Sequence, residues 1–100
     1  MMTIETFQKI LEGYSLKRVL RRGVHTFFEY DYPNLKYDET SNILYIIDYF
    51  TSTRTFIHLD EIKDYEVVPN VDDDGYSHIR FYADTYKYKL LLVFVVKKGR

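Results

Sequence analysis

The sequence predicts an α+β fold in which an N-terminal helical segment, residues 3–22, packs on a mainly antiparallel β-sheet of five to seven strands over residues 24–96. The chain contains eight residues each of Val, Ile and Thr, eleven Tyr and seven Phe, but a single alanine, Ala83. Branched and aromatic side chains favour strands, whereas alanine is the best helix former. The length suits one domain, and no linker or internal repeat divides residues 1–100.

The first expected element is a helix that begins after Thr3. Thr3 is a suitable N-cap, and the spacing of Ile4, Phe7 and Leu11 places these three side chains on one helical face. Gly13 follows at a position where a helix commonly ends. The pattern therefore predicts a short amphipathic helix that buries one apolar stripe.

Residues Ser15–Arg22 form a separate element, because the stripe of the first helix would next fall on arginines. The spacing of Leu16, Val19 and Leu20 favours a second short helix that ends at Gly23. A strand followed by a turn at Arg22-Gly23 explains the same residues nearly as well. We expect the helix and keep the strand as the alternative.

The remainder of the chain reads as strands separated by polar loops. Asp38–Asn42 is a polar loop of hairpin length, and Asp60-Glu61-Ile62 suits a helical turn. Pro33 and Pro69 interrupt the strand pattern. The expected strands are Val24–Tyr30, Leu35–Tyr37, Ile43–Phe50, Thr53–Leu59, Lys63–Val68, Tyr76–Tyr82 and Tyr86–Val96.

The last two strands form the clearest hairpin, and their side-chain pattern predicts its register. A two-residue turn at Asp84-Thr85 would place Phe81 opposite Tyr88 and gather the apolar residues on one face. The opposite face is then basic and aromatic near the turn. Its candidate binding residues are Tyr76, His78, Arg80, Tyr82, Lys87 and Lys89.

The passage Thr55–Val68, a strand, a short Leu-Asp-Glu-Ile turn and another strand, resembles a connection in small bacterial barrels of the pleckstrin-homology-like type. That resemblance implies a sheet that is curved or partly closed. The long C-terminal helix that closes such barrels has no counterpart, because the chain ends four residues after Val96. An open sheet and a partly closed one both remain compatible with the pattern.

The usual catalytic and metal-binding patterns are missing from the sequence. Cysteine is absent, no Gly-x-Ser-x-Gly motif occurs, and the four glycines form no phosphate-binding loop. Asp72-Asp73-Asp74-Gly75 lacks the EF-hand spacing, and His25, His58 and His78 lack the spacing of zinc ligands. We therefore expect neither catalysis nor a metal or cofactor, and we rank a small hydrolase third among the functions.

Two features point to binding. The face described above combines aromatic rings with cations, as surfaces that bind single-stranded nucleic acid or proteins do. A basic cluster precedes Gly23, and it can contact phosphates, an acidic protein surface or the acidic residues of the chain itself. The members of this cluster are Lys17, Arg18, Arg21 and Arg22. We expect a small non-catalytic interaction protein that binds another protein or itself, with a nucleic-acid-binding module as the alternative.

Self-association is expected at the C-terminal strand, which is apolar on both faces in its second half. Leu91, Val93 and Val95 point away from the face that the first helix can cover. Their cover is expected to be a second copy of the chain, or else a sheet that closes into a barrel. The sequence thus predicts a homodimer that buries these three residues.

The sequence also carries expectations about the compartment. It shows no signal-peptide pattern, and its longest apolar run, Leu90–Val96, is far shorter than the roughly 20 residues of a membrane-spanning helix. Together with the absence of cysteine this favours a cytoplasmic protein. Short, tyrosine-rich chains of this kind are common among viral and mobile-element accessory proteins, an association that gives no mechanism.

Overall fold

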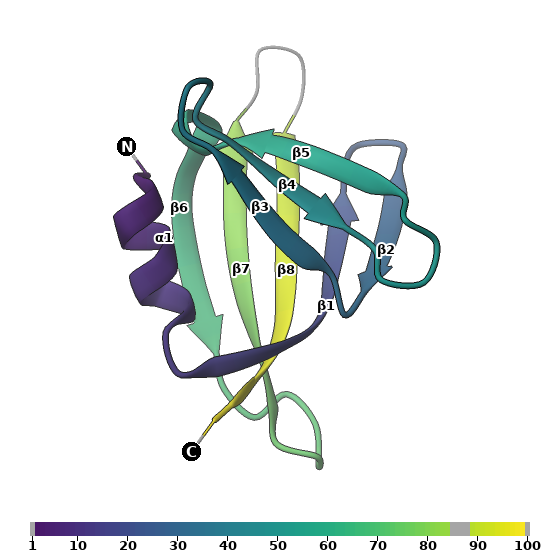
Figure 1. Cartoon of the computed structure of the whole chain (residues 1–100). Coiled ribbons are helices and arrows are strands. Elements are labelled where there is room, and N and C mark those ends of the chain that lie inside the picture. Colours follow the sequence, from purple (N-terminus) through teal and green to yellow (C-terminus); the bar gives the residue numbers. More distant parts are fainter. Residues whose placement is uncertain (1, 85–88, 100) are drawn as a thin grey trace.

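The structure, a computed structural model that describes residues 2–84 and 89–99, contains one helix and two antiparallel sheets within these ranges (Figure 1). Helix α1 spans Ile4–Leu11, and a short 3-10 helix, η1, spans Leu59–Glu61. The strands are β1 (Tyr14–Arg22), β2 (Phe27–Asp31), β3 (Asn34–Asp38), β4 (Ile43–Ile47), β5 (Arg54–His58), β6 (Ile62–Val68), β7 (Tyr76–Asp84) and β8 (Lys89–Lys98). The predicted α+β fold is confirmed.

The larger sheet has the strand order β2-β1-β8-β7-β6, and the smaller sheet has the order β3-β4-β5. The chain passes from the smaller sheet to the larger one through η1, between β5 and β6. Figure 1 shows the three-stranded sheet in front of the five-stranded sheet, with α1 beside β6. The two sheets of the described residues do not close into a barrel, and their eight strands exceed the expected five to seven.

The hydrophobic core lies on one face of the five-stranded sheet, called here the inner face. Phe7 of α1 packs against Phe81 of β7 and Phe94 of β8, with ring centroids 5.1 and 5.6 Å away. Leu44 and Ile46 of β4 join the same buried cluster. The helix and the smaller sheet therefore both cover the inner face.

The first helix agrees with the sequence pattern. The Thr3 hydroxyl oxygen accepts a hydrogen bond from the Thr6 backbone N–H at 3.1 Å, which satisfies one of the free donors at the helix start. Phe7 is the fully buried residue of the helical stripe. Gly13 has φ +81°, a left-handed conformation that side chains disfavour, and it turns the chain from α1 into β1.

The expected second helix is wrong, because residues 15–22 belong to strand β1. A β-bulge between Leu16 and Arg18 inserts an extra residue, Lys17, into the pairing with β8. Leu16 and Val19 therefore face the same core although they are three residues apart. The bulge produces the spacing that otherwise indicates a helix.

The predicted register of the last hairpin is also wrong. Phe81 lies opposite Leu92 rather than Tyr88, and Asp84 belongs to β7, where it pairs with Lys89. Residues 85–88, which include Thr85 of the predicted turn, lie outside the described ranges. The register differs by an even number of residues, and the assignment of side chains to the two faces is unchanged.

Candidate interaction site

The candidate site is the other face of the five-stranded sheet, called here the outer face. An apolar stripe runs along its central strand through Leu91, Val93 and Val95, and Leu20 of β1 lies next to Val93. Val93 is 8% exposed, whereas Leu20, Leu91 and Val95 are half-buried. No helix or strand within residues 2–84 and 89–99 packs on this face. Its apolar stripe is thus partly covered by neighbouring side chains of the same sheet.

The structure brings together two features that lie far apart in the sequence. Because residues 15–22 form β1 beside β8, Arg18 and Arg22 lie on the same face as the aromatic residues of β7. Arg21 is an exception, since it pairs with Leu92 and points to the inner face. Lys87 lies outside the described residues. The other predicted binding residues share the outer face or reach it: Lys17, Arg18, Arg22, Tyr76, His78, Arg80, Tyr82 and Lys89.

Acidic residues of the flanking strands neutralise part of this cationic face. Arg18 Nε donates to Asp31 Oδ1 at 2.8 Å, and Arg80 Nη1 lies 3.5 Å from Glu66 Oε1. The Tyr82 hydroxyl donates to the same Glu66 oxygen at 2.6 Å, and this hydrogen bond raises the pKa of Tyr82. The central strands are therefore basic, and the flanking strands β2 and β6 supply carboxylates.

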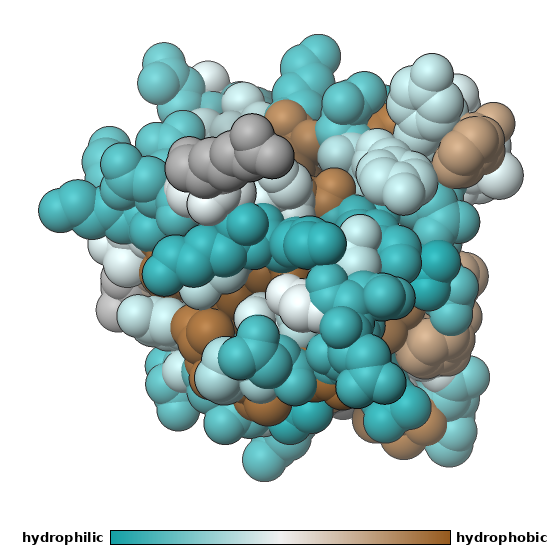
Figure 2. Space-filling model, turned by 90° about the horizontal axis from the view of Figure 1, so that it is seen from below, coloured by the Kyte–Doolittle hydropathy of each residue, from teal (hydrophilic) through white to brown (hydrophobic). Residues whose placement is uncertain are grey.

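One end of the outer face is a hollow between lysines and tyrosines. The ring of Tyr76 has the Lys17 ammonium 4.4 Å from its centroid and the Lys97 ammonium 5.4 Å away. The hollow has a volume of about 390 Å³ and is lined by Ser15, Leu16, Lys17, Tyr32, Tyr76, Lys97, Lys98 and Gly99. Figure 2 looks at this end of the molecule, where hydrophilic side chains cover most of the surface and hydrophobic patches show between them. Such a site suits an anionic group held by ammonium ions beside an aromatic ring.

A second hollow lies at the opposite end of the same strands. Its volume is about 440 Å³, and Arg22, Tyr82, Lys89 and Leu91 of the predicted site contribute to its lining. Val24, Lys63 and the neighbouring residues Gly23, Ala83, Asp84 and Leu90 complete it. The apolar stripe thus connects two hollows that both carry lysine or arginine.

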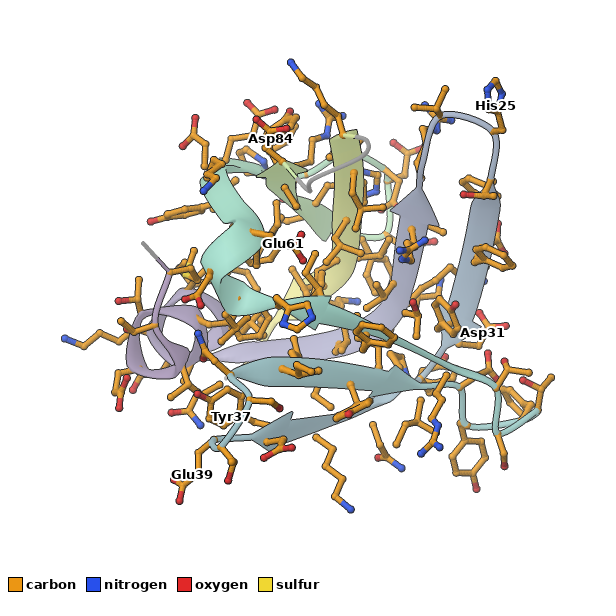
Figure 3. The ribbon with its side chains drawn as sticks, turned by 90° about the horizontal axis from the view of Figure 1, so that it is seen from above. His25, Asp31, Tyr37, Glu39, Glu61 and Asp84 are labelled. Atoms are coloured by element: carbon orange, nitrogen blue, oxygen red, sulfur yellow. The ribbon has the colours of Figure 1, made fainter. Side chains whose placement is uncertain are left out.

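The three histidines lie in different parts of the molecule. His25 is in the turn between β1 and β2 (Figure 3), His58 ends β5, and His78 is on the outer face. Burial lowers the pKa of His78, and the nearby charge of Arg80 lowers it further against the opposing effect of Asp72. Among residues 2–84 and 89–99, no group of three or more acidic, histidine or cysteine side chains is placed to hold a metal ion.

A hydrogen-bonded turn that joins the two sheets was not predicted from the sequence. Asp48 is 5% exposed, and its carboxylate accepts the backbone N–H groups of Asp31 at 2.8 Å, Phe50 at 2.8 Å and Thr51 at 2.9 Å. These donors lower the pKa of Asp48, the Thr51 N–H most of all. The Tyr49 N–H donates to the Asp31 carbonyl at 3.1 Å. The available signal was an Asp at the end of an apolar strand, three residues before the polar run of residues 51–54.

This turn presents two aromatic side chains to solvent. Tyr49 is 66% exposed and Phe50 is 69% exposed, with their rings edge to face at 5.1 Å. The hydrogen bonds of Asp48 fix the backbone beneath them. These aromatic side chains lie beside the end of β2 rather than on the outer face.

Comparisons of the chain with protein-family models, with curated proteins and with solved structures gave no match. The described residues contain no helix with the length and apolar character needed to cross a membrane.

Proposed function

We propose that the protein is a non-catalytic interaction protein that binds another protein through the outer face of its five-stranded sheet. The observation that carries this proposal is the placement of α1 and the smaller sheet on the inner face, which leaves the outer face without a covering element among the described residues. Tyrosine and arginine, which dominate the energetics of many protein interfaces, flank its apolar stripe.

The size and chemistry of the outer face agree with this role. Five strands about 4.8 Å apart, each some 25 Å long, give a face on the order of 600 Å². A typical stable interface buries about 800 Å² on each partner, so this face with its rim is sufficient. Lys89 and Lys97 lie at the two ends of the stripe, and both are exposed. The partner is therefore expected to present an apolar centre with carboxylates around it.

The proposal is tested with two double variants that remove the same residue types from the two sheets. Arg80→Ala/Lys89→Ala changes the outer face, and Arg54→Ala/Lys36→Ala changes the smaller sheet. A partner is first identified by cross-linking in an extract of the source cells, then purified and titrated calorimetrically. We expect the outer-face variant to bind about tenfold or more weakly, and the control to bind like the wild type. Equal affinities of the two variants would contradict the proposal.

Nucleic-acid binding is the second candidate, and the hollow around Tyr76 favours it. The two ammonium groups beside Tyr76 resemble the combination of ring and cation that holds single strands. If they contact phosphates, Lys17→Ala/Lys97→Ala should weaken binding of a fluorescent single-stranded 20-nucleotide probe and lower its logarithmic salt slope by about 1.4. Micromolar binding that disappears in this variant would establish the second candidate, and undetectable binding by the wild type would end it.

A further inference from the structure

Strand β2 forms one edge of the five-stranded sheet, and its hydrogen-bond pattern shows which backbone groups are free. The Tyr32 N–H donates to the Lys17 carbonyl at 2.8 Å, and the Gly23 N–H donates to the Thr26 carbonyl at 2.9 Å. In an antiparallel ladder, hydrogen-bonded pairs alternate with pairs whose N–H and C=O groups point away from each other. In the register of β1 and β2, residues 27, 29 and 31 therefore point their backbone groups outward.

The outward backbone groups of Asp31 are already hydrogen-bonded within the chain. Its N–H donates to the Asp48 carboxylate, and its carbonyl accepts the Tyr49 N–H. The free edge consequently offers the N–H and C=O groups of Phe27 and Glu29. In Figure 3, β2 runs along the margin of the molecule between the labelled His25 and Asp31.

Two of the other three edges of the described sheets, β6 and β3, carry features that oppose pairing with another chain. Strand β6 has a bulge between Ile62 and Asp64, and it carries three charged residues, at positions 63, 64 and 66. Strand β3 carries Lys36 and Asp38. Strand β2 has neither a bulge nor a proline, and it begins with Phe27 and Phe28, which are 50% and 48% exposed. Strand β5, the remaining edge of the described sheets, also lacks a bulge and a proline and exposes Phe56 at 52%, so β2 differs from it in beginning with two adjacent exposed phenylalanines.

We propose that a second copy of this chain pairs antiparallel with β2 about a two-fold axis through Phe28. In this register Phe27 lies opposite the partner's Glu29, and Phe28 lies opposite the partner's Phe28. The two five-stranded sheets then join into one continuous sheet of ten strands. All free backbone groups of Phe27 and Glu29 are hydrogen-bonded in both copies.

The neighbouring registers fail for structural reasons. A register centred on Glu29 requires the backbone groups of Asp31, which Asp48 and Tyr49 occupy. A register centred on Phe27 requires His25, which lies inside the turn closed by the Gly23–Thr26 hydrogen bond. The register centred on Phe28 is the one that needs neither.

The distribution of exposed apolar residues independently supports a second copy as the occupant. The three most exposed large apolar side chains in residues 2–84 and 89–99 are Phe50 at 69%, Val24 at 67% and Tyr49 at 66%. Val24 precedes the start of β2, whereas Tyr49 and Phe50 lie beside its end. An antiparallel two-fold axis places the start of one β2 next to the end of the other. The dimer would therefore bring these side chains together at both ends of the paired strands.

Charge supports the same arrangement. The Arg22 guanidinium lies 5.8 Å from the centroid of the Phe27 ring, on the outer face. In the proposed register the partner's Glu29 follows Phe27 along the same row of side chains. Arg22 reaches over the ring toward that carboxylate, and the two-fold axis creates the contact twice. No like charges face each other directly across the paired strands.

This dimer differs from the one that the sequence predicts at Leu91, Val93 and Val95. Val93 is already 8% exposed within one chain, so that strand has less apolar surface to bury than β2 and its ends. Pairing through β2 leaves the outer face free in both copies. The inference is therefore independent of the partner-binding role proposed above.

The absence of cysteine in the chain permits a direct test by disulfide trapping. Residues that face each other in an antiparallel pair have Cα atoms about 4.5 to 5.5 Å apart, within the range that a disulfide spans. Under mild oxidation, Phe28→Cys should form a covalent dimer by itself. Phe27→Cys and Glu29→Cys should each remain uncross-linked and should form a mixed dimer when combined. Phe56→Cys, at a residue 52% exposed on the smaller sheet, is the control.

A proline variant tests the same pairing without a cross-link. Glu29→Pro removes an outward N–H and leaves the ladder with β1 intact, since edge strands tolerate proline where the N–H faces solvent. By sedimentation at about 100 µM, the wild type and Glu29→Gln should be dimers and Glu29→Pro a monomer with an unchanged circular dichroism spectrum. The proposal would be overturned if the wild type were a monomer or if the Glu29→Pro variant were a dimer. It would also be overturned if Phe28→Cys formed a covalent dimer no faster than Phe56→Cys.

Discussion

Val95 and Val96 are neighbours on the central strand β8, and we predict very different consequences of changing each to alanine. Val96 is 0% exposed on the inner face, whereas Val95 is half-buried on the outer face. Both substitutions remove the same two carbon atoms from the same strand, so the change in strand propensity largely cancels between them. The difference in unfolding free energy isolates the burial of the two faces.

The expected magnitudes follow from these environments. At Val96, the loss of two buried carbons costs about 1.6 kcal/mol in transfer free energy, and the remaining cavity adds about 1 kcal/mol. At Val95, no enclosed cavity forms and the loss is about 0.5 kcal/mol. At about 4 to 8 °C per kcal/mol for a domain of this size, Val96→Ala should lower Tm by about 10 to 20 °C and Val95→Ala by about 2 to 4 °C.

The assay is urea unfolding of both variants, followed by circular dichroism and tyrosine fluorescence at a fixed protein concentration. An unchanged m-value would show that the stability itself has changed. Losses that agree within about 0.5 kcal/mol would refute the reasoning, because the outer face would then be as well covered as the inner face.

Three further predictions concern polar groups. Backbone N–H donors depress the pKa of Asp48 in the folded chain. The carboxylate therefore stabilises the fold at pH values above its unfolded pKa of about 3.9, and this contribution is lost as the pH falls through the folded pKa. Asp48→Asn should remove that part of the acid dependence of the unfolding free energy, measured by urea unfolding between pH 2 and 5. Burial lowers the pKa of His78, so the folded chain prefers the neutral ring and loses stability as the pH falls from about 6.5 toward the folded value. In an NMR titration Arg80→Ala should raise the pKa of His78, and an unchanged or lower value would contradict the assigned cause. The ion pair of Arg18 and Asp31 is 39% exposed on both side chains, so Arg18→Ala should cost less than about 1 kcal/mol, measured by urea unfolding; a loss above 2 kcal/mol would show a structural role.

The sequence was informative wherever one simple period governed an element. The helix after Thr3 and the alternating faces of β7 and β8 follow from side-chain spacing, and both agree with the structure. The spacing in strand β1 did not predict a strand, because the bulge at Lys17 changes the side-chain period within it. A bulge depends on the pairing with β8 and leaves no local signature in the residues that form it.

The candidate site was predictable in its composition but less so in its assembly. The residues of the outer face on β7 and β8 follow from alternation, while the position of β1 beside β8 depends on pairing across most of the chain. That long-range contact is what joins Lys17 to Tyr76. The Asp48 turn and the exposed edge of β2 depend on contacts between the two sheets, which a pattern of single residues does not reveal.

The most direct test of the central claim is a measurement of solvent access to the methyl groups of the five-stranded sheet. A soluble paramagnetic agent added to methyl-labelled protein broadens the NMR signals of groups that it can approach. We predict strong broadening of Leu20, Leu91 and Val95 on the outer face, and little broadening of Leu92 and Val96 on the inner face. Equal protection of Leu91 and Leu92, and of Val95 and Val96, would contradict the claim that the outer face is open to a partner.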